Sequence, residues 1–187
     1  MTIYHDDVDT DLKCTTPRKT DDKQFLVQIS NSNSLEHIQL GKKDGDHCLV
    51  IDSTDNLLRL RVSEDFAKFF NRLDDVVCDM TKSMAQTWFG LSKPLEDDDI
   101  HRMHIPTVKN SQIEIQCSNA LRVFKLDHDE EGKHAWSQSS VVHVEPDSYV
   151  IPLIDIKGIL FTSKNFHINY VLTDILILDQ VYFPFLL

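Results

Sequence analysis

The sequence is poor in glycine, and the motifs that depend on glycine are missing. Only five of the 187 residues are glycine, and neither of the phosphate-binding patterns GxGxxG and GxxxxGK[ST] occurs. The sequence also lacks a GxSxG nucleophile elbow, and no cysteine stands in a recognisable catalytic context. We therefore expect a protein that is not an enzyme and that uses no cofactor.

Closely spaced cysteines and long apolar runs are also lacking. The four cysteines are about thirty or more residues apart, at Cys14, Cys48, Cys78 and Cys117. This spacing matches neither a paired CxxC zinc site nor a dense disulfide framework. No stretch approaches the roughly 18 apolar residues of a membrane span, and MTIYHDDVDTD has no apolar signal-peptide core. We expect a soluble intracellular protein.

Positive charge is in deficit: 19 Lys and Arg stand against 30 Asp and Glu, a formal net charge of -11. Such a charge repels nucleic acid at long range, so a nucleic-acid binder of this composition needs a local basic face. Residues 1–23 hold six Asp and few large apolar groups. Burial cannot offset the entropy of ordering such a segment. We predict a disordered acidic leader over 1–23 and a single β-rich domain over 24–187.

What the sequence does contain is a series of short apolar or alternating runs separated by turn residues. This pattern is typical of β-strands, which we predict at FLVQI (25–29), HCLVI (47–51), LLRLRV (57–62), QIEIQC (112–117), LRVFKL (121–126) and SSVVHV (139–144). A dense β region follows, with YVIPLIDIKGILFT, FHINYVL and DILILDQVYF. The SKN break at 163–165 predicts a hairpin, and Thr173 with Asp174 predicts a second break.

One long stretch has the period of a helix. From Phe66 to Trp88, apolar residues recur at steps of one, three and four, which is the apolar stripe of an amphipathic helix. Ser63 suits the N-cap and Gly90 suits the end. We predict a helix at about 64–89 packed on an antiparallel OB-like β barrel or a β sandwich. The fold class is mainly β, of α+β type.

The stretch QTWFGLSKPLEDDDIHRMHIP (86–106) is the one that most resembles a chemical site. Four acidic residues from Glu96 to Asp99 suit the first turn of a short second helix, because free backbone N–H groups attract negative charge there. His101 and His104 could hold a metal together with Asp97, but no further ligand source is evident in the chain. We predict helix capping and no metal here.

A second acidic stretch, DHDEEG (127–132), matches the first half of a calcium loop. The match fails at its twelfth position, which is Gln138, and strands rather than helices flank it. We interpret it as a polar hairpin loop.

Binding is the remaining class of function. Cations and aromatic rings lie on or beside the predicted strands, and a single-strand binder needs both: cations for phosphates and rings for bases. The candidate nucleic-acid-binding residues are Arg59, Arg61, Arg122, Lys125, Trp136, Lys157, Phe161 and Lys164.

Several stretches together resemble a known group of proteins: LDDVVCDMTKSMAQTWFG (73–90), the IP at 105–106, IPLIDIKGILF (151–161) and FHINYVLTDILIL (166–178). They are similar to a small uncharacterised family of large eukaryotic DNA viruses, and distantly to phage-type single-stranded-DNA-binding proteins. The resemblance implies a five-stranded OB barrel closed by an extended segment near the C-terminus, with Gly158 as its glycine and Phe161, Phe166 and Tyr170 as the following aromatics.

Two functions remain open. The first is a non-enzymatic protein that binds single-stranded DNA or RNA during viral replication. The second is a viral protein-interaction or virion-associated module, because the apolar ending QVYFPFLL (180–187) is typical of a surface for a protein partner or for self-association. If the protein is viral, as the resemblance implies, we expect it in the host cytoplasm or nucleus. Both functions are predictions that the sequence leaves undecided.

Overall fold

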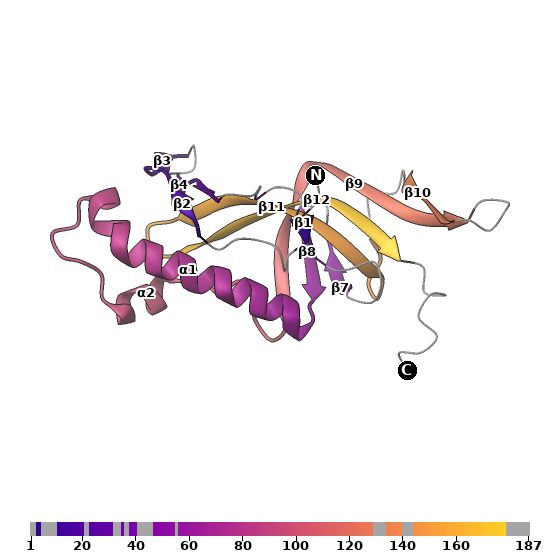
Figure 1. Ribbon diagram of the computed structural model, residues 1–187, viewed down its shortest axis with the longest axis horizontal. Helices are drawn as coiled ribbons and strands as arrows, with labels where there is room; N and C mark the ends of the chain where they lie inside the picture. Colours follow the sequence, from indigo (N-terminus) through magenta and orange to yellow (C-terminus); the bar gives the residue numbers. More distant parts are fainter. Residues whose placement is uncertain are drawn as a thin grey trace.

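The computed structural model describes residues 3–4, 11–20, 23–31, 35, 38–40, 47–54, 56–128, 134–139 and 144–178. Figure 1 shows one long helix, a short second helix and a twisted set of strands. The elements are β1 (Ile3–Tyr4), β2 (Lys13–Cys14), β3 (Arg18–Lys19), β4 (Phe25–Val27), β5 (Ile29–Ser30), β6 (Ile38–Gln39), β7 (Cys48–Ser53), β8 (Leu57–Arg61), α1 (Glu64–Phe89), α2 (Asp97–Met103), β9 (Gln112–His128), β10 (His134–Ser139), β11 (Tyr149–Phe161) and β12 (Phe166–Leu178).

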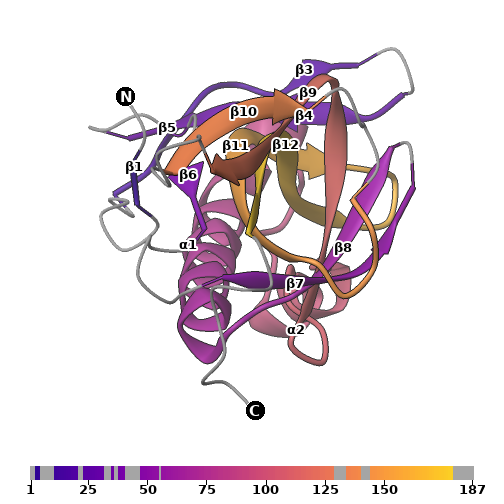
Figure 2. The same ribbon diagram turned by 90° about the vertical axis from the view of Figure 1, so that its right-hand side faces the viewer.

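Five of the strands close into a barrel. In ring order they are β7, β8, β9, β12 and β11, and β11 pairs again with β7. Every neighbouring pair is antiparallel except β9 with β12, which is parallel. Figure 2 shows β7 and β8 at the bottom and right of this ring and β3 and β4 at its top. The fold is a mainly β, OB-like barrel of α+β type, as the sequence predicted.

Most predicted strands are present at the predicted positions, but the bounds of several of them differ from the prediction. QIEIQC and LRVFKL are two parts of the single strand β9, and the predicted break at Thr173 is a bulge inside the continuous strand β12. The hairpin at SKN is confirmed, since β11 and β12 pair antiparallel on either side of it. Of the strand predicted at 139–144, Ser139 is the last residue of β10, which pairs with β9, and residues 140–143 lie outside the described residues.

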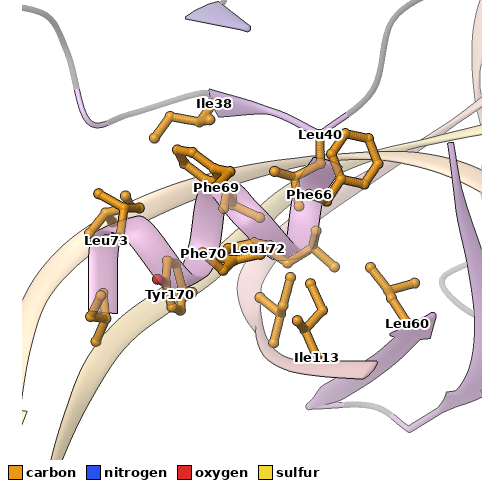
Figure 3. Close-up of a cluster of buried hydrophobic side chains, with 14 of the residues drawn as sticks. Ile38, Leu40, Leu60, Phe66, Phe69, Phe70, Leu73, Ile113, Tyr170 and Leu172 are labelled. Atoms are coloured by element: carbon orange, nitrogen blue, oxygen red, sulfur yellow. The ribbon is translucent and has the colours of Figure 1, made fainter. Parts of the chain in front are cut away.

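The predicted helix is confirmed as α1. The backbone N–H of Phe66 donates to Ser63 Oγ at 3.3 Å, and Gly90 ends the helix with a φ of 61°. The apolar stripe of α1 packs against the barrel, as Figure 3 shows for Phe66, Phe69, Phe70 and Leu73. The buried apolar side chains of the helix and the strands form one cluster.

The described parts of residues 1–23 contain short strands. Strands β1, β2 and β3 fall within this range, and β3 pairs with β4, which in turn pairs with β11. Such pairing satisfies backbone groups that an isolated acidic segment leaves to water.

No helix in the described part of the chain is long and apolar enough to cross a membrane.

Candidate nucleic-acid interface

A groove of about 440 Å³ lies on the outside of the barrel. One side is formed by the neighbouring strands β8 and β9, which contribute Leu57, Arg59, Gln112, Glu114 and Gln116. The groove residues of β9 alternate with the core residues Ile113 and Ile115, because successive side chains of a strand point to opposite faces. The alternation of QIEIQC thus gives this strand an apolar face towards the core and a polar face towards the groove.

The other side of the groove comes from the loop after α2 and the start of β12. The lining residues here are Ile105, Pro106, Thr107, Lys109, Asn110, His167, Ile168, Asn169 and Tyr170. The loop is tied to β12, since the backbone N–H of Ile105 donates to the carbonyl of Phe166 at 2.9 Å. Both walls are therefore held by ordered backbone contacts, and the groove is built into the fold.

Buried polar contacts fix the loop wall to the long helix. Thr107 donates to Asp74 of α1 twice, from its backbone N–H and from its hydroxyl, both at 2.8 Å. The same hydroxyl lies 3.4 Å from the hydroxyl of Tyr170. Asp74 is buried, and a buried carboxylate is stabilised when its oxygens accept hydrogen bonds. The long helix thereby positions one edge of the groove.

The electrostatics of the groove are mixed. The guanidinium of Arg59 donates to Glu114 Oε1 at 2.6 and 2.9 Å, and it also lies 4.0 Å from Asp52. The charge of this arginine is therefore largely balanced by acids on the same face. Lys109 and Arg61 are exposed, and within the described ranges neither takes part in an ion pair. Arg61 stands opposite the groove residue Gln112 in the strand register.

Neutral amide side chains are the groove's most frequent polar groups. Asn110, Gln112, Gln116 and Asn169 all line it, and each amide presents both a donor and an acceptor. Unstacked bases of a single strand expose edges with the same mixed character. None of these residues was among the sequence-predicted candidates, although the period-two polar positions of QIEIQC point to Gln112 and Gln116.

The structure spreads the predicted cations over four places. Arg59 and Arg61 lie at the groove, whereas Arg122 and Lys125 lie on the second half of β9, which pairs with β10. Lys157 is on β11, where its ammonium donates to Asp155 at 2.7 Å. Lys164 is exposed in the turn between β11 and β12. The six predicted cations therefore do not form one surface.

Arg122 has a structural partner. Its Nε donates to Asp174 Oδ1 at 2.6 Å, and the aspartate side chain is only 3% exposed. This buried carboxylate raises the pKa of Arg122 through its hydrogen bond and its charge. The arginine also lies over the ring of Phe124, at 5.8 Å from its centroid. We interpret Arg122 as the counter-charge of Asp174.

Phe161 cannot stack on a base as the sequence prediction required. Its ring is buried, and it packs against Trp88, Phe89 and Phe166 with ring centroids 5.1 to 5.9 Å apart. The aromatic at this position belongs to the core because β11 turns this side of the strand towards the end of α1. Trp136 lies on β10, opposite Leu126 of β9, and its side chain is outside the described part.

The acidic stretch at 96–99 begins the short helix α2. The predicted capping is confirmed: Glu96 is the N-cap of α2, and Asp99 accepts from the backbone N–H of Glu96. His101 is exposed, whereas His104 points inwards and lies 3.4 Å from Asp74. Among the described residues no group of three His, Cys, Asp or Glu side chains is placed to hold a metal.

The remaining predicted sites lie partly outside the described ranges. For DHDEEG, the antiparallel pairing of His128 with His134 confirms the predicted hairpin, and residues 129–133 are not described. The apolar ending at 180–187 also lies outside the described residues.

Comparison with known proteins gave similarity in structure but not in sequence. No protein-family model matches the sequence, and no curated protein matches it. Among solved structures, the chain is similar to the single-stranded DNA-binding protein from bacteriophage Enc34 in complex with ssDNA, with 14% identity and a TM-score of 0.37. The match covers 87% of this chain and 93% of that chain.

Proposed function

We propose that this protein is a non-enzymatic binder of single-stranded nucleic acid and that the groove is its binding site. The observation that carries the proposal is the position of the groove on β8 and β9, which are the second and third strands of an OB-like barrel. This face of the OB fold is the one used for oligonucleotides. From the resemblance given above we further propose that the protein acts in viral DNA replication.

The groove's chemistry suits a single strand of mixed sequence. Lys109 and Arg61 are the cations available for phosphates, while the amides of Asn110, Gln112 and Asn169 can bond base edges. The net charge of -11 opposes association at long range. We therefore expect modest affinity with strong dependence on salt.

The first test is a salt titration of binding to a fluorescent poly-dT oligonucleotide. The wild type should bind at low salt, and Lys109→Ala and Arg61→Ala should each lower the slope of log affinity against log salt by about 0.7, the value for one single-strand phosphate contact. Arg72→Ala is the matched control, since Arg72 is an exposed arginine on α1, away from the groove. Absence of binding at low salt would overturn the proposal.

A gain-of-binding variant makes the test sharper. Glu114→Gln removes an acid from the groove and releases Arg59 from its ion pair. Both changes favour phosphate, so the variant should bind more tightly than the wild type and with a steeper salt slope. An unchanged affinity and slope in Glu114→Gln, together with unchanged slopes in the two alanine variants, would place any binding outside the groove. That result would overturn the groove as the binding site.

A further inference from the structure

A row of four paired residues crosses the outer sheet surface beyond the groove. Arg18 of β3 pairs with Leu26 of β4, Leu26 pairs with Leu160 of β11, and Leu160 pairs with His167 of β12. Residues directly opposite each other in neighbouring strands point to the same face of a sheet. The four side chains therefore lie in one line across the strands.

The opposite face of the same strands confirms which way this row points. The neighbouring row, Val27 with Ile159 and Ile168, is buried in the core. Leu26, Leu160 and His167 are each partly exposed, and Arg18 is exposed. Since side chains alternate along each strand, the row from Arg18 to His167 faces outwards.

This row connects two hollows. His167 lines the groove, while Arg18 and Leu26 line a second hollow of about 250 Å³ together with Thr15, Thr16, Pro17 and Gln28. Neighbouring strands are about 4.8 Å apart, so the three steps from β12 to β3 span roughly 14 Å. In Figure 1, β3 and β4 lie over the end of the β11–β12 hairpin, as this register requires.

The chemistry of the row changes along its length. Leu160 and Leu26 form an apolar floor, and His167 adds a flat ring beside it. Burial, with the charge of His104, lowers the pKa of His167 and so favours its neutral form. Arg18 ends the row as an exposed cation that forms no ion pair with any residue the structure describes.

We propose that the bound single strand leaves the groove at His167, crosses Leu160 and Leu26, and places a phosphate on Arg18. This inference rests on the proposed function and extends its site. An apolar floor suits the faces of bases, and a cation at its far end suits the backbone. The N-terminal strands then belong to the binding surface, and the site is longer than the face of the barrel.

The test compares two lengths of oligo-dT, of about 6 and about 16 nucleotides, which bracket the site sizes of OB folds. Arg18→Ala should lower the salt slope for the long oligonucleotide by about 0.7 and leave the short one unchanged, because the short one is held in the groove. Lys109→Ala should lower the slope for both lengths. Arg72→Ala should change neither.

Two substitutions of opposite charge at one position provide a second test. Leu160→Lys and Leu160→Glu place side chains of similar length in the middle of the row, so any effect on folding is similar in both. The lysine variant should bind the long oligonucleotide more tightly than the glutamate variant, and the two should bind the short one alike. Thermal melts of both variants report that they are folded.

The failures of the two proposals are distinguishable. If the wild type and the groove variants behave as proposed but Arg18→Ala and the Leu160 pair show no dependence on length, the extension over β11 and β4 is wrong and the groove proposal stands. If the wild type binds neither oligonucleotide at low salt, both proposals are overturned.

Discussion

His104 Nε2 lies 3.4 Å from Oδ1 of Asp74, and both side chains are buried. The contact joins the end of α2 to the middle of α1, beside the two hydrogen bonds that Asp74 accepts from Thr107. Because Thr107 lines the groove, this small polar cluster determines where one wall of the groove stands. Its charge state should therefore affect both stability and the shape of the candidate site.

The cluster predicts a loss of stability at alkaline pH. Burial lowers the pKa of His104, but contact with Asp74 and Cys78 raises it more, to about 9 from an ordinary 6.5. The other groups that face the pair are His167 and Tyr170. Since the folded state favours the protonated imidazole, the stabilisation is complete below pH about 6.5 and is lost as pH rises through about 9. It amounts to at most about 3 kcal/mol.

Urea denaturation between pH 6 and pH 10 measures this effect. In His104→Gln the fall in unfolding free energy should be smaller, because the replacement carries no charge to lose. Asp74→Asn should show the same flatter profile, since it removes the carboxylate that favours the charged imidazole. Parallel profiles for the wild type and both variants would contradict the prediction.

Gly158 should not tolerate a side chain. Its φ is 140°, and a Cβ at this position would come within 2.2 Å of the carbonyl oxygen of Val27. Replacing it by alanine forces β4 away from β11, so Gly158→Ala should lower the unfolding free energy by about 2 to 4 kcal/mol, from strain and overpacking together. Gly90 is the matched control, because it also has positive φ but has open space around it. Gly90→Ala should cost about 1 kcal/mol. Equal melting temperatures for the two variants would refute this account of Gly158.

Arg122 should matter for stability more than for binding. Arg122→Ala leaves the buried carboxylate of Asp174 without its counter-charge, and an unpaired buried charge is destabilising. Its melting temperature should fall below those of the wild type and of Lys125→Ala, which removes an exposed cation from the same strand. The salt slope of oligonucleotide binding should stay unchanged in Arg122→Ala. A reduced salt slope with an unchanged melting temperature would show that Arg122 contacts nucleic acid and is not needed for stability.

Phe161 provides a similar contrast among the aromatics. Phe161→Ala empties a position packed by Trp88, Phe89 and Phe166, so it should lower the unfolding free energy by about 3 to 5 kcal/mol. Phe25 lies at the edge of the same cluster, where its ring centroid is 5.8 Å from that of Phe89, and it is 37% exposed. Phe25→Ala should therefore cost clearly less. If Phe161→Ala instead weakened oligonucleotide binding without changing the melting temperature, the ring would be a base-stacking group.

The local sequence pattern was sufficient to predict those elements whose structure depends on only a few neighbouring residues. The stripe from Phe66 to Trp88, the cap at Ser63 and the stop at Gly90 predicted α1 with its correct bounds. The acidic first turn of α2 was predicted correctly as well, because the groups that satisfy a helix start lie within one turn of it. By contrast, the break expected at Thr173 became a bulge, since pairing with β9 and β11 on both sides keeps β12 continuous.

The candidate site was less predictable because its residues come from distant parts of the chain. Sequence adjacency placed Phe161 and Arg122 among the nucleic-acid candidates. In the structure Phe161 belongs to the core, and Arg122 pairs with the buried Asp174. The amides that line the groove had no signal of their own beyond the alternation of QIEIQC. Lys109, which is the exposed cation of the groove's loop wall, was not among the candidates.

By itself the sequence determined a mainly β domain with one long amphipathic helix, because hydrophobic period, caps and turns act over a few residues. Tertiary structure alone decided that β11 closes on β7, that Arg59 is balanced by Glu114, and that Arg18 and His167 lie on one row. These relationships join residues that are 50 to 150 positions apart, roughly speaking, and their register depends on the burial of whole strands against a shared core. The location of the binding surface is therefore a property of strand pairing, which no single segment encodes.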